Sequence, residues 1–395
     1  MNIKQSWLHN LKIHYIWTFF SSVLFLSPII TLYYKFYWFD IQDILILTSL
    51  FTLVSTLLEI PTSTIWDTIW RVKVMKISVL SSLISFIIIF LLSDIYWFYI
   101  AWFFAALWNA LWSGTWHAKL QDDLEASNMQ DDFWKVIGRL IALQNFWKLF
   151  TPIIIYFVLK YFINWYHILA WLDVVTWIIA VIFVFKFIEF WEIKKTENKK
   201  DFISLQITTF KSWFKFLFSH KSLLILILLM ILWNDLWYLA RVLLPNLIEN
   251  WVKDFFSSYI ILFSVLAWIL WNLIPKKLWD KFSWEKVFVI LMFFNALLHF
   301  LAYYFVDNNF ILTIFFVLIS FIIGIYWPTW NHLVMSFTNI AEKATVRSIF
   351  LMVVWIFEAL MLFMLSFASL STWLLVLSIL IFIWFIVWSL YFLKK

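Results

Sequence analysis

Residues 59–73 read Glu59-Ile-Pro-Thr-Ser-Thr-Ile-Trp-Asp67-Thr-Ile-Trp-Arg71-Val-Lys73. They carry the chain from one long apolar run, at about 41–64, to the next, at about 75–93. Runs of about 20 apolar residues are long enough to cross the hydrocarbon core of a membrane as α-helices. This segment therefore marks the place where one predicted membrane helix ends in charged residues and the chain turns to form the next.

The same pattern repeats along the chain. Membrane helices are predicted over residues 12–33, 41–64, 75–93, 95–117, 139–160, 164–187, 223–247, 255–275, 286–305, 310–336, 346–368 and 371–392. The long polar stretch from Glu189 to Lys221 separates the sixth from the seventh. We therefore expect an all-α membrane protein with twelve transmembrane helices in two six-helix repeats, a layout typical of transporters. The expected domains are an N-terminal bundle at 1–187, a cytoplasmic linker at 188–221 and a C-terminal bundle at 222–395.

The composition excludes a soluble protein. The chain of 395 residues is 65% apolar and 13% charged, whereas soluble domains are about 45–50% apolar and about 25% charged. The absence of cysteine excludes disulfides, zinc-thiolate sites and a cysteine nucleophile. The net charge of +6 is too small and too dispersed for a nucleic-acid surface, so no nucleic-acid partner is expected. The sequence contains no P-loop and no metal-ligand spacing, so no cofactor and no metal are expected.

The basic residues predict the orientation in the membrane. Most of the 29 Lys and Arg residues fall in the loops on the side of the two termini, whereas Lys35, Lys160 and Lys253 fall on the opposite side. Basic loops stay in the cytoplasm. We therefore expect a multi-pass protein of the cytoplasmic (inner) membrane, with both termini cytoplasmic and with the lipid bilayer and a small-molecule substrate as partners. A monomer is expected.

Glycine and tryptophan are used abnormally. The chain has 3 Gly and 30 Trp, although average usage of about 7% predicts roughly 28 Gly. Trp108, Trp112 and Trp116 recur on one helix face among Ala and Ser residues, where small residues normally let membrane helices approach. One interpretation is a chain rich in interfacial aromatics, which suits Trp97 and Trp373 near predicted membrane ends. The other interpretation, which we favour, is that many of these tryptophans are encoded by UGA codons that the source of the gene reads as glycine.

The segment at 59–73 resembles the signature loop of the major facilitator superfamily, Gly-x-x-x-Asp-Arg-x-Gly-Arg-basic, between its second and third helices. Asp67 and Arg71 match this pattern, Trp70 stands where the family has glycine, and Lys73 supplies a base one residue late. A degenerate copy that includes Asp280 falls at the corresponding place in the second half, at 278–286. Residues 110–124 and 343–348 are similar to two further segments of bacterial members.

The resemblance implies a function for this loop. Asp67, Arg71, Lys73 and Asp280 would form a latch that holds one conformation through charge-assisted contacts and releases it in the other. The alternative is that the basic residues only fix the membrane orientation.

Ionisable residues inside predicted membrane helices are candidates for a substrate or proton pathway. Each costs at least about 2.5–3.5 kcal/mol at mid-bilayer on insertion scales, so it should face the bundle interior. The pathway candidates are Glu59, Lys148, Asp235, Arg241, Asn331 and Glu358. Glu59, Asp235 and Glu358 could carry a proton or meet a cationic substrate. The alternative is a static ion pair or a side chain that reaches the interface, which we favour for Arg139 and Asp173.

Other polar residues are expected to be unremarkable. The acidic stretch at 121–133, which includes Asp122 and Asp123, is expected to be a solvated loop. Asn331 and His332 could line a cavity, but His332 is expected to be a hydrogen-bonded interior histidine.

These features predict a secondary active transporter that moves a small molecule across the membrane by alternating access, with proton-coupled efflux as the specific expectation; uptake is equally compatible. The protein is not expected to be an enzyme. Two alternatives remain open. One is an integral-membrane transferase with His117 or His332 as base, and the other is a non-transporting membrane sensor on the same fold.

Overall fold

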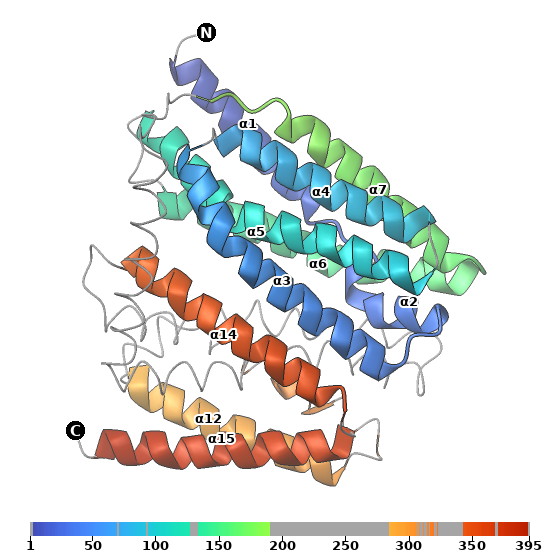
Figure 1. Ribbon diagram of the computed structural model, residues 1–395, viewed down its shortest axis with the longest axis vertical. Coiled ribbons are helices and arrows are strands. Elements are labelled where there is room, and N and C mark those ends of the chain that lie inside the picture. Colours follow the sequence, from blue (N-terminus) through green and yellow to red (C-terminus); the bar gives the residue numbers. More distant parts are fainter. Residues whose placement is uncertain are drawn as a thin grey trace. The chain divides into compact units, whose positions relative to one another are not determined.

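The computed structural model describes residues 3–68, 71–91, 94–126, 133–189, 284–305, 343–367 and 370–393, together with a few residues between 308 and 322 (Figure 1). The predicted helices at 223–247 and 255–275, most of the one at 310–336 and most of the linker lie outside these ranges. Within some described helices, notably at 60–68, only the backbone is described.

Every regular element of the described ranges is a helix. In chain order they are α1 (Ile3–Ser21), the 3-10 turn η1 (Ser27–Ile29), α2 (Ile30–Phe36), α3 (Ile41–Thr68), α4 (Arg71–Leu91), α5 (Ile95–Ala126), α6 (Phe133–Tyr161), α7 (Trp165–Val184), α12 (Trp284–Tyr304), α14 (Lys343–Leu365) and α15 (Leu370–Leu393). Five of them are long and apolar enough to cross a membrane, over Ile41–Glu59, Arg71–Leu91, Ile95–Trp112, Trp165–Val184 and Lys286–Tyr304.

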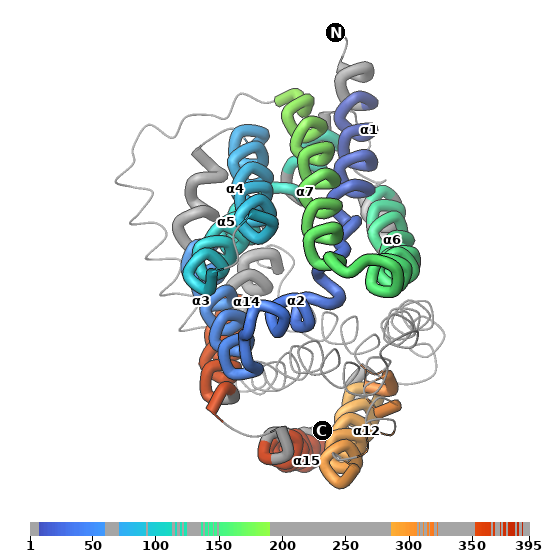
Figure 2. The backbone as a smooth tube through the Cα atoms, turned by 90° about the vertical axis from the view of Figure 1, so that its right-hand side faces the viewer, coloured from blue at the N-terminus to red at the C-terminus, as the bar shows by residue number. Residues whose placement is uncertain are grey.

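The chain forms two compact units, Met1–Trp38 with Leu50–Ser204 and Phe39–Ser49 with Leu205–Lys395. In the first unit, α1, α4 and α7 lie side by side (Figure 2). The helices α4 and α5 pack extensively, and small residues of both, Ser78 and Ser82 on α4 and Ala106 on α5, are buried. The Ser78 hydroxyl donates to the Trp108 carbonyl across this contact, at 3.1 Å. Small side chains let membrane helices approach closely.

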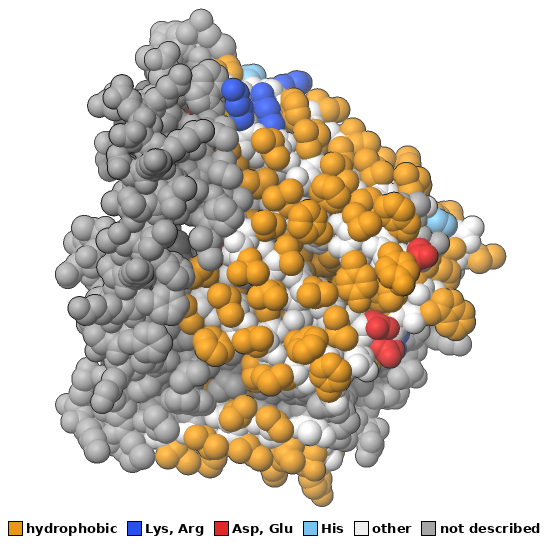
Figure 3. Space-filling model, viewed as in Figure 1, with side chains coloured by type: hydrophobic (Ala, Val, Ile, Leu, Met, Phe, Trp, Pro, Cys, Tyr) orange, Lys and Arg blue, Asp and Glu red, His pale blue; other side chains and the backbone are white. Residues whose placement is uncertain are grey.

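Apolar side chains cover the outside of the helices. Figure 3 shows orange side chains spread over the face of the described helices, with Lys and Arg gathered at one end. Ile77 and Ile84 on α4 and Ile182 on α7 are each 41–52% exposed. A soluble protein rarely exposes so continuous an apolar surface, and lipid is its natural solvent.

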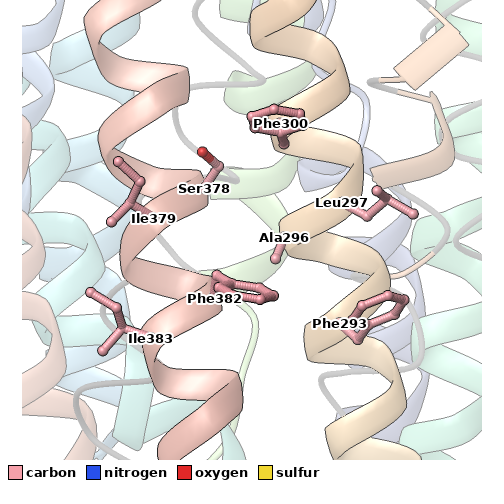
Figure 4. Close-up of a pocket in the computed structure, with 8 residues that line it drawn as sticks. All are labelled: Phe293, Ala296, Leu297, Phe300, Ser378, Ile379, Phe382 and Ile383. Atoms are coloured by element: carbon pink, nitrogen blue, oxygen red, sulfur yellow. The ribbon is translucent and has the colours of Figure 1, made fainter.

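In the second unit, α12 packs against α15. An apolar groove of about 370 Å³ follows this contact, and Ser378 and Phe382 of α15 with Ala296 of α12 lie between the two helices (Figure 4). It is lined by Phe293, Ala296, Leu297, Phe300, Ser378, Ile379, Phe382 and Ile383. A groove with almost no polar surface suits acyl chains better than a polar substrate.

The prediction of one helix over 12–33 is wrong. The helix α1 ends at Ser21, and η1 begins only at Ser27. Pro28 near the start of η1 has no backbone N–H and cannot donate a hydrogen bond to the turn before it. The amides of Phe25 and Leu26 instead donate to the Asp173 carboxylate of α7, at 2.7 and 3.0 Å. Asp173 is expected from the sequence to be a static residue near a helix end. It is fully buried, and its carboxylate accepts hydrogen bonds from two amides that have no partner within a helix.

The prediction of a helix end at 117 and a solvated loop at 121–133 is also wrong in part. The helix α5 continues to Ala126, and Asp123 is 1% exposed. The helix extends because Lys119 and Asp123, one turn apart, pair inside the first unit.

Candidate functional site

The signature loop meets α5 at one end of the first unit. Arg71, the first residue of α4, forms an ion pair with Asp122 of α5, and both side chains are about one quarter exposed. The segments at 59–73 and 110–124, which separately resemble the major facilitator pattern, therefore contact each other in the structure. Lys73 is exposed on α4. Asp67 lies in the last turn of α3, but its side chain is outside the described residues, as is Asp280 altogether.

The Asp122 carboxyl is held in a balance of opposing effects. Burial raises its pKa, and the Arg71 guanidinium partly opposes this shift. A raised pKa means that the folded chain keeps the proton to higher pH than the unfolded chain does, so ionisation of this group lowers stability as the pH rises. The ion pair with Arg71 is therefore a contact that limits the cost of charge at this position.

A second contact ties the same end of α4 to the chain that follows α7. The amide of Val72 donates to the Glu189 carboxylate at 2.8 Å. Carboxylates are stabilising at helix N-termini, where amides have no partner within the helix. Glu189 thus fixes the start of α4 from the end of the sixth predicted membrane helix.

Beside these contacts lies a buried polar cluster, which we define as Asn10 and His14 of α1 with Lys119 and Asp123 of α5. All four side chains are 0–1% exposed. Asp123 Oδ1 accepts from Lys119 Nζ and from Asn10 Nδ2, the latter at 3.0 Å. Its Oδ2 contacts His14 Nε2 at 3.2 Å. One carboxylate therefore joins three side chains from two helices.

Asn10 also binds the backbone beyond α7. Its Nδ2 donates to the Ile188 carbonyl at 2.9 Å, and its Oδ1 accepts from the Ile188 amide at 3.0 Å. His9 Nε2 contacts the Lys186 carbonyl at 3.0 Å. The cluster consequently ties α1, α5 and residues 186–188 together.

The arrangement is a buried structural cluster that holds helices together. Buried charges are tolerated when they are paired and hydrogen-bonded, and the cluster is closed to solvent. A site of this kind orients helices. It offers no surface on which a substrate would bind, and its Asp123 is next in sequence to Asp122, the partner of Arg71.

The predicted pathway residues are only partly visible. Glu59 is half-buried on α3, and Glu358 on α14 is 0% exposed. The side chain of Lys148 on α6 is outside the described residues, as are Asp235, Arg241 and Asn331. Because Glu59 and Glu358 belong to different units and the other side chains lie outside the described ranges, the pathway residues stay predictions. His117 and His332, the candidate bases of a transferase, also have side chains outside these ranges.

The sequence analysis missed the buried polar cluster. The opposite charges of Lys119 and Asp123 at i, i+4 are a helix signal, but it lies beyond the end predicted for that helix. Asn10 and His14 are one helical turn apart on α1 and carry no recognisable motif. Their role appears only when α1 and α5 are placed together.

These helices define the class of the protein: it is an all-α, multi-pass membrane protein with the major facilitator fold. No protein-family model and no curated protein sequence matches the chain.

Particular solved structures match almost all of it. The nucleoside transporter NupG has a TM-score of 0.72 at 14% identity, covering 99% of both chains. The POT family transporter PepTSo has a TM-score of 0.75 at 11% identity, covering 99% of this chain and 98% of its own. A D-xylose–proton symporter has a TM-score of 0.71 at 11% identity, covering 98% and 97%. At such identities the similarity establishes the fold, and the fold confirms the predicted class.

Proposed function

We propose that this chain is a secondary active transporter that moves a small organic molecule across the cytoplasmic membrane by alternating access, in the specific form of proton-coupled efflux. The observation that carries the proposal is the match of 98–99% of the chain to a nucleoside transporter, a D-xylose–proton symporter and a peptide transporter. The same match favours a transporter over the transferase. The substrate, the coupling and the direction are the parts of the proposal that need an experiment.

Glu358 is the residue we propose for proton coupling. It is 0% exposed on a helix of the second unit, and burial of a carboxyl at membrane depth favours a group that gains and loses a proton. In proteoliposomes screened with nucleosides, pentoses and short peptides, a pH gradient is expected to accelerate net transport of at least one class. Glu358→Gln is expected to lose about tenfold or more of the gradient-driven rate, equivalent to ~1.4 kcal/mol, while exchange of labelled for unlabelled substrate continues.

The exposed Asp94→Asn is the matched control and should keep both activities. If Glu358→Gln keeps full gradient-driven transport, Glu358 leaves the coupling scheme. If no compound moves with folded protein in the vesicles, the transporter proposal itself fails.

The latch of Asp67, Arg71, Lys73 and Asp280 is tested as another arm of the same assay. Removing one partner of a charge-assisted contact costs about 1.5–3 kcal/mol, which biases the two conformations by roughly tenfold or more. Asp67→Asn is therefore expected to slow net transport by about that factor without changing the amount of folded protein. Normal transport by Asp67→Asn would leave the basic residues with an orienting role only.

The proposed orientation, with cytoplasmic termini, rests on the excess of basic residues in the loops on that side. The chain contains no cysteine, so single substitutions report the two sides directly. In intact cells, a membrane-impermeant maleimide is expected to label Lys35→Cys and to spare Lys395→Cys. Labelling of Lys395→Cys before cell lysis would reverse the orientation.

A further inference from the structure

Trp38 adopts a backbone conformation that suits glycine. Its φ is 67°, and it is the one non-glycine residue with positive φ among those that the structure describes. The residue follows the end of α2, where its amide donates to the Lys35 carbonyl at 3.0 Å and the Tyr37 amide donates to the Tyr34 carbonyl at 2.9 Å. Helices that end in this way usually have glycine at the left-handed position, because a Cβ is disfavoured there. The indole gains no packing in return, since Trp38 is 95% exposed.

A second, independent observation comes from the helix contacts of the first unit. The indole nitrogens of Trp17 on α1, Trp108 on α5, Trp147 on α6 and Trp177 on α7 are buried and have no hydrogen-bond partner in the described part of the chain. A buried tryptophan normally finds a partner for its N–H. Four orphaned donors in one helical unit are therefore a departure that needs a cause.

Three of these indoles, those of Trp17, Trp108 and Trp177, lie against another indole where helices cross. The Trp17 ring lies 4.1 Å from that of Trp112, between α1 and α5. The Trp108 ring lies 5.5 Å from that of Trp177, between α5 and α7. Trp108 and Trp112 are one turn apart on α5, where small residues such as Ala106 are buried. Glycine at these positions would give α5 the small residues at four-residue spacing that membrane helices use to pack closely.

Other tryptophans lie in environments that are usual for this side chain in membrane proteins. The Trp102 indole donates to the Tyr34 hydroxyl, and Trp97 is about half exposed near the start of α5. Partnered indoles and interfacial indoles are the usual environments of this side chain in membrane proteins. The structure thus sorts the tryptophans into two sets with different surroundings.

We propose that the first set is glycine in the natural protein, encoded by UGA codons that its source reads as glycine, and that Trp102 is a genuine tryptophan. The set consists of Trp17, Trp38, Trp108, Trp112, Trp147 and Trp177. The count of 3 Gly in 395 residues points the same way. The proposal concerns the identity of the chain and is independent of the transport function.

The decisive experiment is to sequence the gene and to determine the residue masses of the natural protein. We expect UGA at the six positions and UGG at Trp102, and tandem mass spectrometry of peptides from the natural source should show residue masses of glycine at the six and of tryptophan at 102. UGG codons or tryptophan masses at the six positions overturn the proposal. UGA at position 102 overturns the sorting of the two sets.

A stability comparison tests the same proposal through the fold. We expect the chain with all six positions changed to glycine to unfold at a higher temperature in detergent than the chain with tryptophan. The matched control, Trp102→Gly, removes a partnered indole and is expected to shift unfolding to a lower temperature. A lower unfolding temperature for the six-glycine chain contradicts the proposal.

Discussion

Asp123→Ala is expected to destabilise the protein by about 3–5 kcal/mol, the range measured when one partner of a buried ion pair is removed. The carboxylate faces Lys119, Asn10 and His14, and all of them are buried with it. Without it, the Lys119 ammonium stays at a site closed to solvent, and α1 loses its polar connection to α5. Thermal unfolding of purified protein in detergent, followed by circular dichroism, measures the loss.

Its neighbour supplies the control. Asp122 is also paired with a basic residue, but both partners are about one quarter exposed. Partly exposed pairs contribute less than about 1 kcal/mol, and burial already raises the pKa of this carboxyl. Asp122→Ala should therefore unfold close to the parent temperature. Equal losses for Asp122→Ala and Asp123→Ala would contradict the distinction between a surface pair and the buried polar cluster.

A paired substitution separates the charge from the packing. Replacing both members of a buried ion pair by apolar residues of similar volume is often neutral or stabilising. Lys119→Met combined with Asp123→Leu is therefore expected to recover a large part of the stability lost by Asp123→Ala. No recovery would mean that Asn10 and His14, which the double variant also deprives of the carboxylate, carry most of the energy.

The sequence predicts the fold class because twelve apolar runs leave few other solutions, and local signals place the ends of some helices within three residues. The predicted helix at 164–187 is α7, Trp165–Val184, and the one at 286–305 is α12, Trp284–Tyr304. Apolar length is a local property, so no tertiary information is needed to see it.

The errors share a different physical origin. The break between Ser21 and Ser27 lies in an apolar run whose hydropathy hides it, and the acceptor of its amides is in α7, 147 residues away in sequence for Leu26. The extension of α5 past residue 117 consists of polar residues whose composition is typical of a loop. It is helical, and Asp123 within it contacts His14 of α1. A buried polar contact between distant segments decides the break, and no periodicity in one segment reveals it. The extension of α5 has a local signal, the i, i+4 pair of Lys119 and Asp123, but its burial depends on contacts of Asp123 with Asn10 and His14 of α1. The described residues leave the pathway candidates as predictions.

Asp173→Ala is expected to destabilise the first unit by roughly 2–6 kcal/mol, since two buried amides lose their acceptor at about 1–3 kcal/mol each. Asp173 is fully buried, and its two oxygens each accept from one amide of the break, Phe25 at 2.7 Å and Leu26 at 3.0 Å. Asp173→Asn keeps one acceptor and should lose less. Thermal unfolding reports the total loss, and hydrogen–deuterium exchange of a peptide covering residues 25 and 26 locates it.

The matched control is Asp94→Ala. Asp94 also accepts from a backbone amide, that of Tyr96 at 3.1 Å, but at the exposed start of α5. Losing such a cap costs typically about 1 kcal/mol, and exchange at residues 25 and 26 should not change. Pro28 remains in both variants. Faster exchange at residues 25 and 26 in Asp173→Ala alone would therefore show that the Asp173 carboxylate stabilises the break between α1 and η1. Unchanged exchange there would show that Pro28 and the local serines hold the break without it.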